Sequence, residues 1–99
     1  PTLMIRRELL ARFGYREQGW PEDYDLLLRL LAAGLDLGIV ARRLHVWRDS
    51  PTRLTRSAPA YRLERLTACK AHHLAADFLA DRSDYLLWGH GETGAALRR

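Results

Sequence analysis

Two adjacent carboxylates, Glu22 and Asp23, are the residues of this chain with the clearest capacity for chemistry. They follow Pro21, and a proline before acidic residues predicts the first turn of a helix, where backbone N–H groups and the helix dipole favour ionised carboxylates. An ionised carboxylate beside a loop that admits a substrate can take a proton from a hydroxyl group. The pair could therefore supply a general base, with Trp20 of the preceding loop contacting the substrate. The spacing alone favours the simpler interpretation that both acids only cap the helix.

A third acid, Asp25, lies four residues before Arg29, so the two side chains can pair on one face of the predicted helix. This helix should cover residues 22–34, and its leucines lie on almost every side. They are Leu26, Leu27, Leu28, Leu30 and Leu31. A helix that is apolar nearly all round is normally buried, so we expect a core larger than this chain can supply. Asp23 and Asp25 face different sides and are not interpreted as a metal-binding pair.

His45 and Arg48 are candidates for binding a phosphate group. β-branched and aromatic residues predict one or two strands within residues 37–47, followed by an irregular loop over residues 48–59. Arg48 is the better candidate, because a guanidinium matches phosphate geometry. His45 is interpreted as a structural residue of the strand, with a metal or diphosphate contact as the less favoured alternative.

The longest predicted helix covers residues 60–80, and its apolar stripe consists of Leu63, Leu66, Ala71, Leu74 and Phe78. His72 and His73 are adjacent, so their side chains point about 100° apart and cannot hold one metal ion together. We interpret both as solvated and expect no metal site. Cys69 is the only cysteine and has no partner that would activate its thiolate, so a buried structural role is expected.

Gly89, Gly91 and Gly94 follow a short apolar run at residues 85–88 that predicts a strand, and a helix is expected to begin at Ala95. This G-x-G-x-x-G spacing would let backbone amides approach a pyrophosphate. A tight strand-to-helix turn without a nucleotide is the favoured interpretation, and binding of a dinucleotide is the alternative.

The composition and the apolar pattern argue against three classes of protein: nucleic-acid-binding, membrane-spanning and secreted. The 99 residues carry 16 basic and 12 acidic side chains, and 15 of the basic ones are arginines scattered along the chain, so we expect no nucleic-acid partner. The longest apolar stretch, residues 26–35, is far shorter than the roughly 20 residues that span a bilayer. Residues 1–7 do not have the pattern of a signal peptide. These features predict a cytoplasmic protein, with the inner face of the membrane as an alternative.

An ordered series of short motifs resembles the C-terminal half of the catalytic domain of family-2 glycosyltransferases. The motifs are Arg6-Arg7-Glu8, Phe13-Gly14-Tyr15-Arg16, Glu22-Asp23, Asp25-Leu26, Leu28-Arg29-Leu30 and Gly34. The resemblance covers residues 1–57. It implies transfer of a sugar with inversion from a nucleotide-sugar to an acceptor hydroxyl in glycan biosynthesis, with Asp23 as the catalytic base and Glu22 as its neighbour. It also implies that His45 and Arg48 face either the phosphates of the donor or a flexible loop.

The fold implied by the resemblance is α/β, a helix-rich, acceptor-side half of a mixed-sheet, nucleotide-sugar-binding domain. Residues 2–6 and a segment within 37–46 should then be strands of one sheet that packs against the helix at 22–33. A helix is also expected at residues 7–13, ended by Gly14. We divide the chain into residues 1–57 of the catalytic domain, a long helix or linker at 58–82, and the start of a Rossmann-like extension at 83–99.

The chain begins at Pro1 without an initiator methionine and ends at Arg99 inside a predicted helix, so we expect a piece of a longer protein. Its implied partners are the N-terminal half of the same protein, which would hold the nucleotide-sugar and a Mg²⁺ or Mn²⁺ ion, and a sugar or glycan acceptor. The piece alone should bind no cofactor tightly and should be inactive. An alternative is a non-catalytic helical interaction module, and exposed apolar surface would then favour a homodimer.

Overall fold

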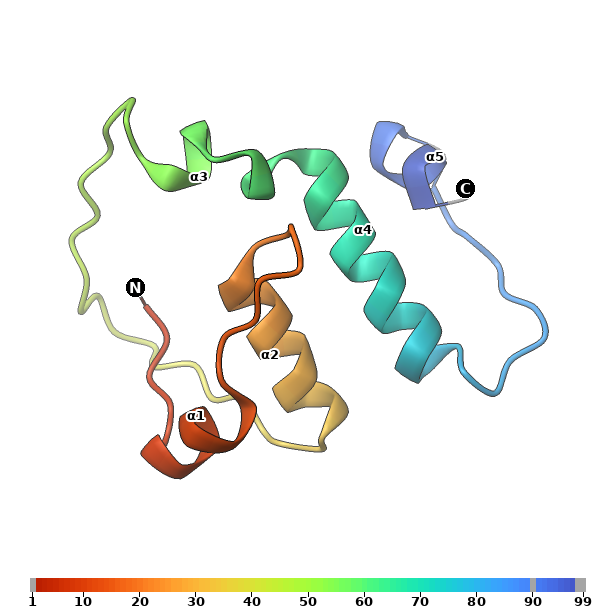
Figure 1. Cartoon of the computed structure of the whole chain (residues 1–99), viewed down its shortest axis with the longest axis horizontal. Coiled ribbons are helices and arrows are strands. Elements are labelled where there is room, and N and C mark those ends of the chain that lie inside the picture. The colour runs from red at the N-terminus through yellow and green to blue at the C-terminus, as the bar shows by residue number, and fades with distance from the viewer. Residues whose placement is uncertain (1, 90, 98–99) are drawn as a thin grey trace.

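The computed structural model describes residues 2–89 and 91–97 of the chain. Within these residues the regular structure consists entirely of helical segments joined by extended connections (Figure 1). The segments are α1 (Arg7–Phe13), α2 (Glu22–Ala32), α3 (Leu54–Ser57), η1 (Pro59–Tyr61), α4 (Leu63–His73), η2 (Leu74–Phe78) and α5 (Glu92–Leu97).

The predicted mixed sheet is absent from the described residues, so the α/β fold class is wrong for this chain. Residues 2–6, 37–47 and 85–88 were expected to be strands, and none of them is paired with another segment. A strand is stabilised by hydrogen bonds to its neighbour, and a local sequence pattern cannot supply that neighbour. The runs at residues 37–47 and 85–88 are therefore extended connections between helices, and residues 2–6 are an extended segment before α1.

The first two helices agree with the sequence pattern. Helix α1 covers the predicted residues 7–13 and ends at Gly14, which adopts φ +57° and donates its N–H to the Leu10 carbonyl oxygen. Helix α2 begins at Glu22 directly after Pro21, with three acids in its first turn. Gly34, with φ +73°, follows its C-terminal end. Both glycines supply the positive φ that commonly terminates a helix.

The long helix predicted over residues 60–80 is interrupted. A short 3-10 turn, η1, precedes it, and Arg62 between η1 and α4 has extended backbone with ψ 152°. Beyond α4 the chain continues as the π-helical turn η2. The loop predicted at residues 48–59 contains the single helical turn α3.

Helix α2 lies between α1 and α4, while α5 contacts the other side of α4 (Figure 1). The small core sits where α2 meets α4, and its fully or almost fully buried apolar side chains are Leu26, Leu30 and Cys69. Leu31, by contrast, is 46% exposed, so the helix is less completely covered than its sequence predicts.

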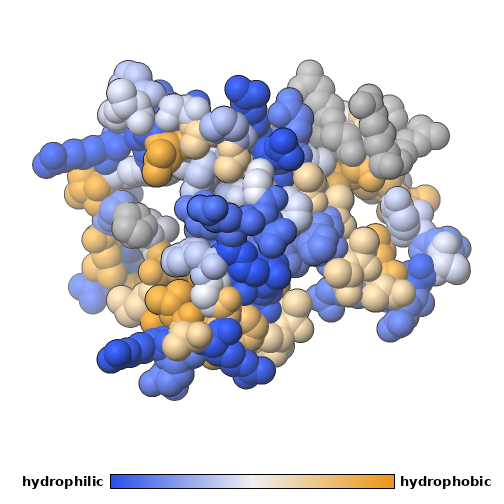
Figure 2. All heavy atoms as spheres, viewed as in Figure 1, coloured by the Kyte–Doolittle hydropathy of each residue, from blue (hydrophilic) through white to orange (hydrophobic). Residues whose placement is uncertain are grey.

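Most apolar side chains lie outside this core. The accessible surface is 8962 Å², compared with about 5,800 Å² for a folded monomer of this mass. The radius of gyration is 15.6 Å, compared with about 13 Å for a globular domain of this length. Figure 2 shows hydrophobic residues on both sides of a hydrophilic centre. None of the helices in the described parts of the chain is long and apolar enough to cross a membrane.

Leu26→Ala tests whether this small core holds the helices together. Leu26 is fully buried, so its truncation should lower the free energy of unfolding by about 2–5 kcal/mol in urea titrations followed by circular dichroism. Leu44→Ala is the control, because Leu44 is 69% exposed and should change stability little. Equal losses in both variants would show that the core is misplaced.

Candidate functional site

Asp25 is the most completely buried charged residue of the described chain, with an exposed fraction of 0%. Its Oδ1 accepts hydrogen bonds from Arg16 Nη2 at 2.8 Å and from Trp20 Nε1 at 3.3 Å. Its Oδ2 accepts from Arg16 Nε at 3.1 Å and from Arg29 Nε at 2.8 Å. His73 Nε2 lies 3.0 Å from Oδ1, and it must donate because an ionised carboxylate only accepts. We call these five residues the Asp25 cluster.

The Asp25 cluster joins three parts of the fold. Arg16 and Trp20 come from the loop between α1 and α2, and His73 comes from the last turn of α4. Arg29 also donates from Nη1 to the Phe13 carbonyl oxygen at 2.6 Å and from Nη2 to that of Gly14. Carbonyl groups at a helix end have no partner within the helix, so Arg29 both pairs with Asp25 and caps α1. The predicted pairing of Asp25 with Arg29 is confirmed.

The pKa of Asp25 is held well below its ordinary value of 3.8. Burial alone would raise it, because a carboxylate loses hydration in the interior. Hydrogen bonds from Arg16, His73, Arg29 and Trp20 together outweigh that penalty, since they favour the ionised form. Asp25 therefore stays charged and cannot act as a proton acceptor near neutral pH.

Asp25, Cys69 and His73 offer ligand atoms within 4.8 Å of one another. Both oxygens of Asp25 already accept hydrogen bonds from guanidinium groups, whose two positive charges would repel a metal cation. Burial raises the pKa of the Cys69 thiol, and the neighbouring Asp25 adds to the effect, so the thiolate that would bind a metal is disfavoured. We interpret the three residues as a structural group.

Glu22 and Asp23 lie in the first turn of α2 but in different environments. The Tyr61 hydroxyl donates to Glu22 Oε1 at 3.1 Å. Asp23 is exposed, and its Oδ1 accepts a hydrogen bond from the Tyr24 backbone N–H at 2.8 Å. Within the described residues no hydrogen bond reaches Asp23 Oδ2. Among the described residues each carboxylate thus keeps one oxygen without a hydrogen bond, and the two differ because Glu22 is held by another side chain while Asp23 is exposed.

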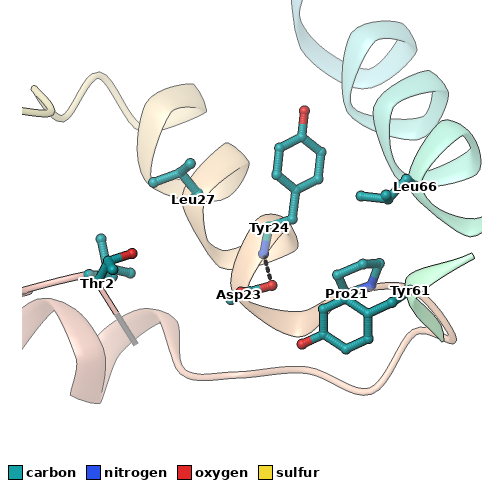
Figure 3. A pocket seen from close by; sticks show the side chains of 8 residues that line it. Thr2, Pro21, Asp23, Tyr24, Leu27, Tyr61 and Leu66 are labelled. Atoms are coloured by element: carbon teal, nitrogen blue, oxygen red, sulfur yellow. Dashed lines mark hydrogen bonds between the residues drawn. The ribbon is translucent and has the colours of Figure 1, made fainter. Parts of the chain in front are cut away.

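A pocket of about 390 Å³ opens beside Asp23 (Figure 3). Its wall comes from the N-terminal segment, the first two turns of α2, η1 and α4, and it is mostly apolar or aromatic. It is lined by Thr2, Leu3, Pro21, Asp23, Tyr24, Leu27, Tyr61 and Leu66. The pocket is open to solvent rather than enclosed. Asp23 is the only carboxylate among the lining residues.

The other predicted site residues lie elsewhere. Trp20 belongs to the Asp25 cluster, and its ring centroid lies 5.3 Å from that of His72. His45 and Arg48 are exposed on the extended connection before α3 and do not line the pocket. His73 was interpreted as solvated, but its side chain is only 13% exposed and bonded to Asp25.

The turn at residues 89–94 needs glycine at two positions for steric reasons. Gly89 adopts φ +97°, and a Cβ at Gly94 would overlap the Gly89 carbonyl oxygen, so both positions require glycine for this turn. Gly91 has open space around it. Helix α5, expected to begin at Ala95, begins at Glu92. His90 lies outside the described residues.

Arg16, Tyr61 and His73 were not identified as site residues from the sequence. A signal for Arg16 was present: a carboxylate on an otherwise apolar helix face needs more than one partner to be buried, and Arg16 lies in the adjoining loop. Tyr61 and His73 are 39 and 48 residues from their carboxylate partners. No local spacing predicts contacts at that separation.

Comparisons with protein-family models, with curated proteins and with solved structures give no match.

Asp25→Asn should destabilise the chain by about 3 kcal/mol at neutral pH, measured by urea unfolding. This loss of unfolding free energy is near the lower end of the range for breaking a buried ion pair, because the Arg16 side chain is 40% exposed and water can hydrate it. The pKa of Asp25 is lower in the folded chain than its ordinary value of 3.8. The ionised side chain therefore stabilises the fold above pH 3.8, and this contribution is lost as the pH falls below that value. The variant should therefore lose less stability than the wild type on acidification.

Asp36→Asn is the matched control, because Asp36 is exposed beyond the end of α2. If both variants unfolded at the same urea concentration at pH 7, the Asp25 cluster would not stabilise the fold.

Proposed function

We propose that this chain is the acceptor-side part of a nucleotide-sugar-dependent, inverting glycosyltransferase, with Asp23 as its catalytic base. One observation carries the proposal: Asp23 is exposed and is the carboxylate that lines the pocket beside α2. Asp25 is committed to two arginines and Glu22 to Tyr61. Of the three acids, Asp23 is therefore the one suited to meet an acceptor hydroxyl.

The fold counts against this proposal, because the family resemblance implies a mixed sheet and the described residues contain helices and no strand. What supports it is the position of the acidic pair at a helix N-terminus, together with the ordered motifs of residues 1–57. The helix dipole and backbone N–H groups favour the ionised form that a base needs.

In the proposed reaction the acceptor lies in the pocket with its hydroxyl hydrogen-bonded to Asp23. Asp23 takes the proton as the acceptor oxygen attacks the anomeric carbon, and the bond from that carbon to the nucleoside diphosphate breaks with its electron pair. Leu27, Leu66 and the ring of Tyr61 give the acceptor an apolar surface and exclude water from one side.

The described residues offer no fitting site for the divalent metal that the resemblance implies. Among these residues, one group of ligand-type side chains comes together, and its Asp25 oxygens already accept the hydrogen bonds of the Asp25 cluster. The metal ion and the donor phosphates would therefore be held by residues other than those described.

A second candidate is a non-catalytic interaction module. Apolar side chains are exposed on η2 and on the extended connection before α3, with Phe78 65% and Trp47 68% exposed. Exposed apolar side chains mark an interaction site where they form a contiguous patch. Sedimentation equilibrium separates the candidates, because a self-associating module should form dimers whether or not Asp23 is present.

Asp23→Asn in the complete enzyme should lower kcat by about 10²–10⁴, because asparagine keeps the size of the side chain but cannot accept the proton. The donor KM should change little, since Asp23 faces the acceptor. Asp36→Asn is the control and should leave kcat unchanged. A normal rate for Asp23→Asn with a slow Glu22→Gln would assign the base to Glu22.

The chain of 99 residues by itself should transfer no sugar. A base without a bound donor provides neither proximity nor stabilisation of the leaving diphosphate. Radiolabelled nucleotide-sugars incubated with the purified chain and simple acceptors provide the assay. Turnover that persists after repeated purification would contradict the division into donor and acceptor parts.

A further inference from the structure

We propose that Tyr61 is a positioning residue that determines which of the two adjacent carboxylates, Glu22 or Asp23, serves as the base. The inference deepens the proposed function and rests on it. Tyr61 lies outside residues 1–57, so the motifs behind the family resemblance do not include it.

The contact that carries this inference links distant parts of the chain. Tyr61 is the last residue of η1, and its hydroxyl donates to Glu22 Oε1 at 3.1 Å across a separation of 39 residues. Its side chain also lines the pocket next to Asp23 (Figure 3). One tyrosine therefore binds the first carboxylate of the pair and forms part of the wall that faces the second.

The hydrogen bond has a fixed direction. Burial raises the pKa of Tyr61 to about 12, and the hydrogen bond to Glu22 contributes to the increase. The hydroxyl therefore keeps its proton through the working pH range, and the Glu22 carboxylate remains the acceptor. Glu22 is half-buried, whereas Asp23 is exposed.

The hydrogen bond from Tyr61 keeps the Glu22 side chain away from the position where a proton would be accepted. Glu22 has one more methylene than Asp23 and adjoins it in the same helical turn, so a free Glu22 side chain could turn toward an acceptor in the pocket. The bond to Tyr61 keeps it at η1 instead, and Glu22 does not line the pocket. Asp23 is left as the carboxylate that meets the hydroxyl.

The test is a double-mutant cycle on kcat in the complete enzyme. Tyr61→Phe keeps the ring and removes the hydroxyl, so alone it should change kcat by less than about tenfold, because Asp23 remains available as the base. In the Tyr61→Phe background, Asp23→Asn should cost at least about tenfold less than in the wild type, because the released Glu22 can replace the lost base. Adding Glu22→Gln should remove this residual activity.

A purely structural role for Tyr61 predicts a different result. The losses from Tyr61→Phe and Asp23→Asn would then multiply, which would overturn the inference while leaving Asp23 as the base. Tyr85→Phe is the matched control, because Tyr85 is 63% exposed and should show multiplied effects with Asp23→Asn. If Asp23→Asn alone lost no activity, Asp23 would not be the base, and this inference would fail together with that assignment.

A measurement on the chain itself tests the contact without any activity. Glu22→Gln should lower the pKa of Tyr61 from about 12, because the carboxylate that accepts the hydrogen bond of the Tyr61 hydroxyl is removed. Ultraviolet absorbance of tyrosinate, with Tyr61→Phe used to assign the transition, provides the readout. An unchanged Tyr61 transition in Glu22→Gln would show that the hydrogen bond is absent in solution and would overturn the inference.

Discussion

The rest of the structure depends on one buried carboxylate and the partners that keep it charged. Asp25 is fully enclosed, and an isolated charge in that position would be strongly unfavourable. Arg16, Arg29, Trp20 and His73 compensate, and because they come from the loop, from α2 and from α4, the chain must bring these parts together. With so few buried apolar residues, this polar cluster specifies how α2 sits against its neighbours. A cluster of this kind contributes to specificity as well as stability.

Three acids in the first turn of α2 have separate roles because their surroundings differ. Asp25 points into the protein and is held by two guanidinium groups. Glu22 is bound by Tyr61, and Asp23 faces the pocket. The Asp25 cluster fixes the orientation of α2, and that orientation decides which acid faces the pocket. The proposal that Asp23 is the base rests on this placement.

Local features of the fold could be predicted from the sequence. Leucine spacing and Gly14 define α1, the proline and acids define the start of α2, and the i,i+4 rule predicts the pairing of Asp25 with Arg29. Each of these depends on residues within one or two helical turns.

Contacts between distant residues could not be predicted in this way. The bonds of Tyr61 to Glu22 and of His73 to Asp25 depend on how α2 and α4 pack, and adjacent histidines were interpreted as solvated because no partner was near in sequence. The predicted sheet failed for a related reason. Residues 37–47 have the composition of a strand, but a strand also needs a paired neighbour, and the described residues supply none.

The ionisation of Asp25 can be followed directly by nuclear magnetic resonance of its side-chain carboxyl carbon in the isotopically labelled chain. With two arginines, an indole and an imidazole bound to it, the resonance should remain that of a carboxylate as the pH is lowered through 3.8, the ordinary value for this residue type. It should change only at lower pH, when the chain begins to unfold. A resonance that titrates at the ordinary value while the chain is still folded would contradict the account, because Asp25 would then be an unpaired acid and could not orient α2.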